Sequence, residues 1–165
     1  MPRNREHRHF FRGSHLPVLM KLVQSTTGPI LELGCGWFST PYLHWACFPT
    51  RRKLVTCENL PAYYDFAKLG EADFHEVQCI QDWDTVDLSR PWGIAFVDND
   101  PEEYRKILIG RLHHADYVIV HDTQRTRNGF REVARTFRYH YKYRDTMPAT
   151  SVLSDVHDLS GFAIP

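Results

Sequence analysis

Short, mostly apolar runs recur along the chain, and segments with helical spacing of apolar residues separate them. Each run has the length of a buried strand, and strands are expected at 29–33, 53–57, 74–80, 92–97 and 116–120. The segments before and between the runs predict helices at 16–23, 40–47, 61–69 and 101–114. Buried strands that alternate with helices are typical of a parallel sheet covered on both faces. The pattern therefore predicts a doubly wound, Rossmann-like α/β fold with a mainly parallel sheet.

The last part of the chain has a different pattern. Residues 129–137 predict a helix, and 138–144 alternate basic or histidine side chains with tyrosines, a period of two that is typical of a strand. Two short stretches, 150–153 and 161–164, are expected to supply one or two closing strands. The sheet is therefore expected to be closed by an antiparallel C-terminal strand.

No internal repeat or linker divides the 165 residues, a length typical of one domain. We expect an N-terminal basic segment and helix at 1–28, a core that carries the binding site at 29–123, and a C-terminal helix and strands at 124–165.

Composition narrows the class of protein. The chain has 20 Lys and Arg against 20 Asp and Glu, so its net charge is zero, and 42% of its residues are hydrophobic, as in ordinary soluble domains. No apolar run approaches the roughly twenty residues of a membrane helix, and the Arg- and His-rich N-terminus does not resemble a secretory signal. The cysteines form no close pair, so we expect them to be buried and reduced in a cytoplasmic protein. They are Cys35, Cys47, Cys57 and Cys79.

The charges are balanced but unevenly distributed. Residues 125–144 carry seven basic side chains against one acid and interleave them with aromatic rings, whereas 95–104 is acidic. Basic and aromatic residues together are the ingredients of nucleic-acid binding. Alternatively, the tyrosines pack on the sheet and the arginines are solvated. The zero net charge favours the second interpretation.

Polar residues follow the end of each predicted strand. Ligands of an open parallel sheet bind at the carboxyl ends of the strands, where the strand order reverses. Gly34 and Gly36 allow a tight turn and a close approach of a ligand, and Glu58 can accept hydrogen bonds from both hydroxyls of a ribose. The remaining strand ends carry Asp82-Trp83, whose carboxylate and ring suit an adenine, Asp98-Asn99-Asp100 and His121-Asp122-Thr123. Together these ends predict a nucleoside site.

At these positions the chain resembles class I S-adenosylmethionine-dependent methyltransferases. Residues 31–36, LELGCG, resemble the first motif of that family, and the other strand ends fall where its later motifs fall, over about residues 29–123. The acid at 98 together with His121-Asp122-Thr123 is most similar to small bacterial members related to sugar and natural-product O-methyltransferases. The resemblance implies S-adenosylmethionine as cofactor and a small-molecule acceptor, methylated on oxygen.

The resemblance also implies roles for individual residues. Gly34 and Gly36 would back the methionine part of the cofactor, and Glu32 would hold its amino group. Glu58 would bind the ribose, and the adenine would lie against Asp82 and Trp83. The rest of the expected cofactor set is Cys35, Ser39 and Asn59.

One position departs from the family. Many members have a third glycine where this chain has Phe38. The bulky Trp37 and Phe38 would then stack on the cofactor or close over it. Since the chain has little inserted material, substrate contacts are expected from the N-terminal segment, the loop after His121 and the basic, aromatic C-terminal region.

Methyl transfer to oxygen needs in-line alignment and a base. Asp98 would face the methyl group, and Asp98 or His121 is the expected base, with Asp122 beside them. In a variant of this hypothesis, a divalent cation held by Asp98, Asp100 and Asp122 acidifies the acceptor hydroxyl. The spacing of these acids differs from that in metal-using relatives, so the metal-free site is favoured. Two other classes stay open: a nucleic-acid-binding or RNA-modifying protein, and a cofactor-binding protein without catalysis.

Overall fold

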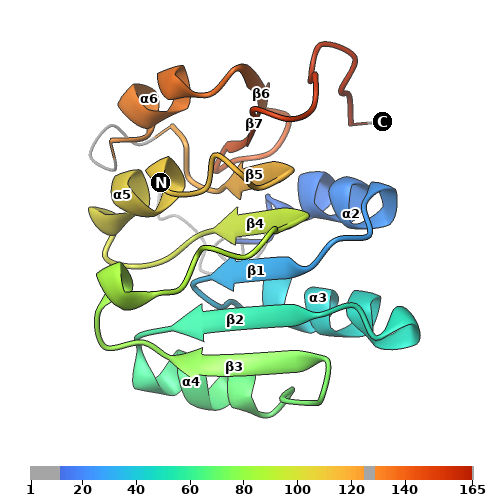
Figure 1. Cartoon of the computed structure of the whole chain (residues 1–165), viewed down its shortest axis with the longest axis vertical. Helices are drawn as coiled ribbons and strands as arrows, with labels where there is room; N and C mark the ends of the chain where they lie inside the picture. The colour runs from blue at the N-terminus through green and yellow to red at the C-terminus, as the bar shows by residue number, and fades with distance from the viewer. Residues whose placement is uncertain (1–11, 125–128, 165) are drawn as a thin grey trace, which may run out of the picture.

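The apolar runs form the parallel strands that their pattern predicts. The computed structural model describes residues 12–124 and 129–164. The five parallel strands are β1 (Ile30–Leu33), β2 (Leu54–Glu58), β3 (His75–Cys79), β4 (Ile94–Val97) and β5 (Tyr117–Val120). Two more strands, β6 (Tyr139–Tyr143) and β7 (Thr150–Ser154), join them in one sheet of order β3-β2-β1-β4-β5-β7-β6 (Figure 1). Because β7 runs antiparallel to β5 and β6, the predicted antiparallel closure is confirmed.

Helices cover both faces of this sheet. The helices are α2 (Leu16–Ser25), α3 (Ser39–Cys47), α4 (Pro61–Lys68), α5 (Tyr104–Gly110) and α6 (Phe130–Val133). One apolar cluster packs α2 and α3 against alternate strand residues such as Ile30 and Phe96. The other packs α5, α6 and the chain segment between β3 and β4 against the opposite face. The sequence prediction of a doubly wound α/β fold is therefore confirmed. No helix of the described residues is long and apolar enough to cross a membrane.

The strand order reverses between β1 and β4, and the carboxyl ends of these two strands nearly touch. Gly34 has φ +86°, and a Cβ built on it would lie 2.6 Å from both Cα and N of Asn99. Only glycine fits this close approach without strain. The loops that follow β1 and β4 are therefore packed backbone to backbone at the switch point of the sheet.

The structure narrows or corrects the expectations for three parts of the chain. The helix predicted at 101–114 spans only α5, because residues 101–103 form a turn that orients Arg105 toward the sheet edge and the helix ends at Gly110. Residues 161–164 form no strand. Phe162 instead packs edge-on against Tyr141. All four cysteines are free as expected, but Cys79 is exposed because it lies on β3, the edge strand.

Candidate functional site

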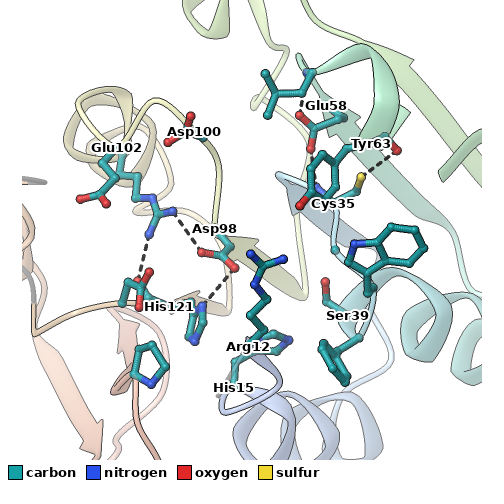
Figure 2. A pocket seen from close by; sticks show the side chains of 17 residues that line it. Arg12, His15, Cys35, Ser39, Glu58, Tyr63, Asp98, Asp100, Glu102 and His121 are labelled. Atoms are coloured by element: carbon teal, nitrogen blue, oxygen red, sulfur yellow. Dashed lines mark hydrogen bonds and ion pairs between the residues drawn. The ribbon is translucent and has the colours of Figure 1, made fainter. Parts of the chain in front are cut away.

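A cavity of about 410 Å³ opens at the carboxyl ends of β1, β2, β4 and β5. Figure 2 shows two groups of polar side chains across it: Asp98 and His121 on one side, and Glu58, Cys35 and Tyr63 on the other. The predicted residues that line it are Cys35, Gly36, Ser39, Glu58, Asp98, Asp100, His121 and Asp122. The sheet therefore brings the ends of four strands into one site, as the position of the switch point requires.

Glu58 links the loops that follow β1 and β2. Its carboxylate accepts hydrogen bonds from the backbone N–H of Cys35 at 2.9 Å and from those of Asn59 and Leu60 at 2.8 Å each. The residue is only 4% exposed, yet it lines the cavity. A carboxyl group held by three donors is a fixed acceptor, because its orientation is set before any ligand arrives.

Glu32 holds the same glycine loop from beneath. It is fully buried and accepts hydrogen bonds from the hydroxyls of Thr40, at 3.0 Å, and Thr56, at 2.8 Å. Thr40 in turn accepts the N–H of Gly36 at 3.0 Å. Behind Thr56, the ring of His75 donates from Nε2 to the threonine hydroxyl. Glu32 thus positions the loop through Thr40 and lies outside the cavity, so the predicted contact with the cofactor amino group would be indirect.

The burial of Glu32 predicts a pH effect on stability. Burial, opposed by the hydrogen bonds, raises the pKa of Glu32 to about 7. The unfolded chain loses this proton near its ordinary pKa of about 4.5, so the folded protein binds more protons between the two values and stability falls as pH rises through that range. Glu32→Gln removes the titration. The stability of the variant relative to wild type should therefore rise by about 3 kcal/mol from pH 4.5 to pH 7.5 and then stay level.

Urea unfolding of both proteins across this pH range measures the effect. The other titrating groups cancel in the difference between the two curves, including His75, whose pKa burial lowers to about 4. Parallel curves would mean that folding does not raise the pKa of Glu32 and would contradict the account of its burial.

A buried charge network forms the opposite wall. Asp98 accepts a hydrogen bond from Arg105 Nη2 at 3.0 Å through Oδ1 and one from His121 Nδ1 at 3.0 Å through Oδ2. Arg105 also donates to the carbonyls of Asn99 at 2.8 Å and His121 at 3.1 Å. Although burial acts to raise the pKa of Asp98, the charges of His121 and Arg105 outweigh it and lower this pKa below its usual range. Asp98 is therefore a fixed negative charge at neutral pH.

Two residues before α2 complete this wall. The hydroxyl of Ser14 donates to the carbonyl of Pro148 at 2.7 Å and lies 2.9 Å from His121 Nε2, so it accepts the Nε2 proton. The ring of His15 packs edge-on against His121, with centroids 4.7 Å apart. Burial lowers the pKa of His15 to about 3, so its ring is neutral. Both of its nitrogens are buried without a hydrogen-bond partner among the described residues.

Five predicted cofactor residues lie outside the cavity lining. Glu32 and Gly34 support the loop from beneath, and Asn59 contributes its backbone N–H to Glu58. Asp82 is exposed and accepts a hydrogen bond from the backbone N–H of Asp84, while the buried Trp83 donates from Nε1 to the carbonyl of Asp100 at 3.1 Å. The contact of Asp82 and Trp83 with an adenine stays a prediction.

Sequence reasoning missed several lining residues. Arg105 could have been predicted from the sequence, because it has the helical spacing of the apolar residues Leu108, Ile109 and Leu112. It therefore lies on the buried face of α5. No sequence pattern marked Arg12 or His15 as lining residues, although the N-terminal segment as a whole was expected to contact the substrate. Trp37 and Phe38 line the cavity, as their place in the glycine loop suggested.

The basic, aromatic region does not form a free aromatic surface where it is described. Tyr139, Tyr141 and Tyr143 of β6 pack against the apolar cluster under α2, while Arg135 and Arg138 are exposed. Arg125 and Arg127 lie outside the described residues. Because the tyrosines are used in packing, the stacking surface that single-stranded nucleic acid needs is absent from β6 as described.

Known proteins resemble this chain in structure only. No protein-family model and no curated protein matches it. Rv0187 from MTB, crystallised with a cofactor bound, has a TM-score of 0.64 at 19% identity, covering 88% of this chain and 80% of that chain. The O-methyltransferase from Bacillus cereus, in complex with SAH, has a TM-score of 0.59 at 18% identity, covering 86% and 79%. TomG from Streptomyces achromogenes, an O-methyltransferase of tomaymycin synthesis in complex with SAM, has a TM-score of 0.55 at 21% identity, covering 86% and 78%. The chain therefore has the fold of S-adenosylmethionine-dependent methyltransferases.

Proposed function

We propose that the protein transfers a methyl group from S-adenosylmethionine to an oxygen atom of a small molecule. The observation that carries the proposal is the cavity at the switch point, with a glycine loop on one strand end and a fixed acidic acceptor, Glu58, on the next. This arrangement, in a fold shared with structures that hold SAM or SAH, supports a nucleoside ligand with a ribose next to Glu58.

The residues present fit this cofactor. The cavity volume of about 410 Å³ lies within the usual range for small ligands. The rings of Trp37 and Tyr63 supply apolar lining for the nucleoside, and Cys35 and Gly36 supply a loop that a ligand can approach closely. The cofactor, when bound, supplies the electrophilic methyl group.

The acid–base groups for the acceptor would be Asp98, His121 and Asp122. Since Asp98 is ionised and bonded to His121 Nδ1, it would orient the imidazole and balance its positive charge. Both ring nitrogens of His121 donate, Nδ1 to Asp98 and Nε2 to Ser14, so the imidazole has no free lone pair for a substrate proton. The proton that an oxygen acceptor releases would therefore pass to the carboxylate of Asp98, which lines the cavity. Asp122 lines the cavity one residue further on and would contact the acceptor.

Calorimetric titration with S-adenosylhomocysteine tests the cofactor site. Wild type should bind it, and Glu58→Gln should weaken binding about 10- to 100-fold, because the variant loses charge-assisted hydrogen bonds to the ribose. The control is Glu71→Gln, which changes an exposed carboxylate paired with Lys68 and should leave affinity unchanged. Circular dichroism verifies that each variant is folded. Equal affinity in wild type and Glu58→Gln would remove Glu58 from the site, and no binding to wild type would refute the proposed cofactor.

A further inference from the structure

The described residues contain one group of three side chains with the donor atoms of a metal site. In this group, His15, Asp98 and His121 each offer one ligand atom, and these atoms all lie within 4.8 Å of one another. His121 Nδ1 and Asp98 Oδ2 are already 3.0 Å apart. The oxygen-only set that the sequence analysis considered as a variant, Asp98 with Asp100 and Asp122, is not gathered in this way among these residues.

We propose that His15, Asp98 and His121 bind a divalent transition-metal ion of the Zn²⁺ type. Two imidazoles and one carboxylate suit Zn²⁺ and its neighbours better than Mg²⁺ or Ca²⁺, which prefer oxygen ligands only. Ligands about 2.1 Å from a tetrahedral ion lie roughly 3.4 Å apart. The His121–Asp98 separation of 3.0 Å is close to this value, and no two of the three ligand atoms are more than 4.8 Å apart, so the ligands would approach one another when the ion binds.

The condition of His15 is the strongest support. The residue is 3% exposed, and neither ring nitrogen has a hydrogen-bond partner among the described residues. Burial of an unpaired polar ring costs free energy. A metal ion between His15, Asp98 and His121 would remove this cost, because the free nitrogen lone pair of His15 would become a ligand.

The other two ligands are held by hydrogen bonds to neighbouring groups, as the ligands of bound metal ions usually are. His121 Nε2 is fixed by the hydroxyl of Ser14, which itself donates to the carbonyl of Pro148. This assignment leaves Nδ1 as the metal-binding nitrogen, directed at Asp98. Asp98 Oδ1 is held by Arg105, so Oδ2 is the oxygen that faces His121. The ion would replace the proton that His121 and Asp98 share.

The ion would also be accessible and its charge balanced. All three ligands line the cavity, which leaves positions of the ion open to solvent or a further ligand. The guanidinium groups of Arg12 and Arg105 add positive charge nearby, but five carboxylates line the same cavity and offset it: Glu58, Asp98, Asp100, Glu102 and Asp122. The proposal does not depend on the proposed methyl transfer, since it concerns the binding of the metal alone.

Co²⁺ and Zn²⁺ binding to the full chain, freed of metal by a chelator, tests the site without cofactor. One Co²⁺ per chain is expected, with visible absorption typical of nitrogen and oxygen ligands and without a thiolate charge-transfer band. His15→Phe should lower the affinity about 100-fold or more, since it removes a direct ligand, and Ser14→Ala about 10-fold through His121. The control, His44→Phe, alters the separate His44–His75 pair and should leave the affinity unchanged.

Several outcomes would overturn the proposal: no stoichiometric binding, full affinity in His15→Phe, a thiolate band, or loss of binding only in His44→Phe. Equal competition by Mg²⁺ would also overturn it, because an oxygen-only site would then be bound. Should His15→Phe fail to fold, the ¹⁵N imidazole resonances of wild type decide the question. Zn²⁺ should shift those of His15 and His121, and unchanged resonances would refute the site.

Discussion

Asp98→Asn should lower the free energy of unfolding by about 3–5 kcal/mol at pH 7. The substitution keeps the shape of the side chain but removes the charge that Arg105 and His121 face. Both partners have side chains only 5% exposed, so water cannot replace the lost carboxylate. Urea unfolding measured on wild type and variant gives the difference directly.

The matched control is Asp100→Asn, two residues further along the same loop. Asp100 is exposed, so the same substitution there should change the free energy of unfolding by no more than about 0.5 kcal/mol. The pKa of Asp98 is lowered in the folded protein, so its contribution is fully present above the unfolded pKa of about 4 and is lost as pH falls through the folded pKa. The difference in free energy of unfolding between wild type and Asp98→Asn should therefore decrease below about pH 4. Equal costs for the two variants would contradict the buried network.

The same variant tests the proposed chemistry. At temperatures where Asp98→Asn stays folded, turnover with a methyl acceptor should fall about 10²- to 10⁴-fold, while affinity for S-adenosylhomocysteine changes little. The reason is that the variant lacks the carboxylate that would receive the proton of the acceptor. Unchanged turnover would remove Asp98 from the proposed acid–base machinery.

Gly34→Ala should destabilise the protein by at least about 3 kcal/mol. The backbone there has φ +86°, which costs an alanine about 1–2 kcal/mol, and the new Cβ would overlap the backbone of Asn99 at 2.6 Å. Because Asn99 belongs to the loop after β4, the overlap would separate the ends of β1 and β4. The measurement is again the urea midpoint and slope of the purified variant.

Gly36→Ala is the matched control, two residues away in the same loop. Its Cβ would lie 3.4 Å from the Ser39 hydroxyl, a contact that a small movement of that side chain relieves. Stability should change by less than about 1 kcal/mol. Because Gly36 lines the cavity, its loss should instead weaken the binding of S-adenosylhomocysteine. A tolerated Gly34→Ala would mean that the two strand ends are not packed as described.

The sequence contains enough information for the sheet and for the strand ends. The run at 92–97 is apolar throughout and the run at 29–33 is interrupted only by Glu32, because β4 and β1 are buried on both faces. Other polar residues follow these runs only at the sheet edge. Glu58, Asp98 and His121 were therefore predictable by position. The burial of Arg105 was also predictable, because this charged residue occupies a position that the helical pattern places on the buried face.

Other features depend on contacts between segments far apart in the sequence. His15 is buried because α2 carries it against Phe96 and His121, and no local pattern encodes that contact. The helix expected over 101–114 extends only over α5, and Arg105 within it is bonded to Asn99, Asp98 and His121, which are contacts that helical periodicity cannot express. Residues 161–164 are a further example, because their apolar side chains pack on the sheet although their backbone does not pair with a strand.

A crystal structure grown with S-adenosylhomocysteine would test the central claim most directly. The account predicts one ligand molecule in the cavity at the ends of β1, β2 and β4, with its ribose hydroxyls hydrogen-bonded to Glu58 and its sulfur on the side of Asp98 and His121. An empty cavity at saturating ligand, or a ligand bound away from Glu58, would contradict it.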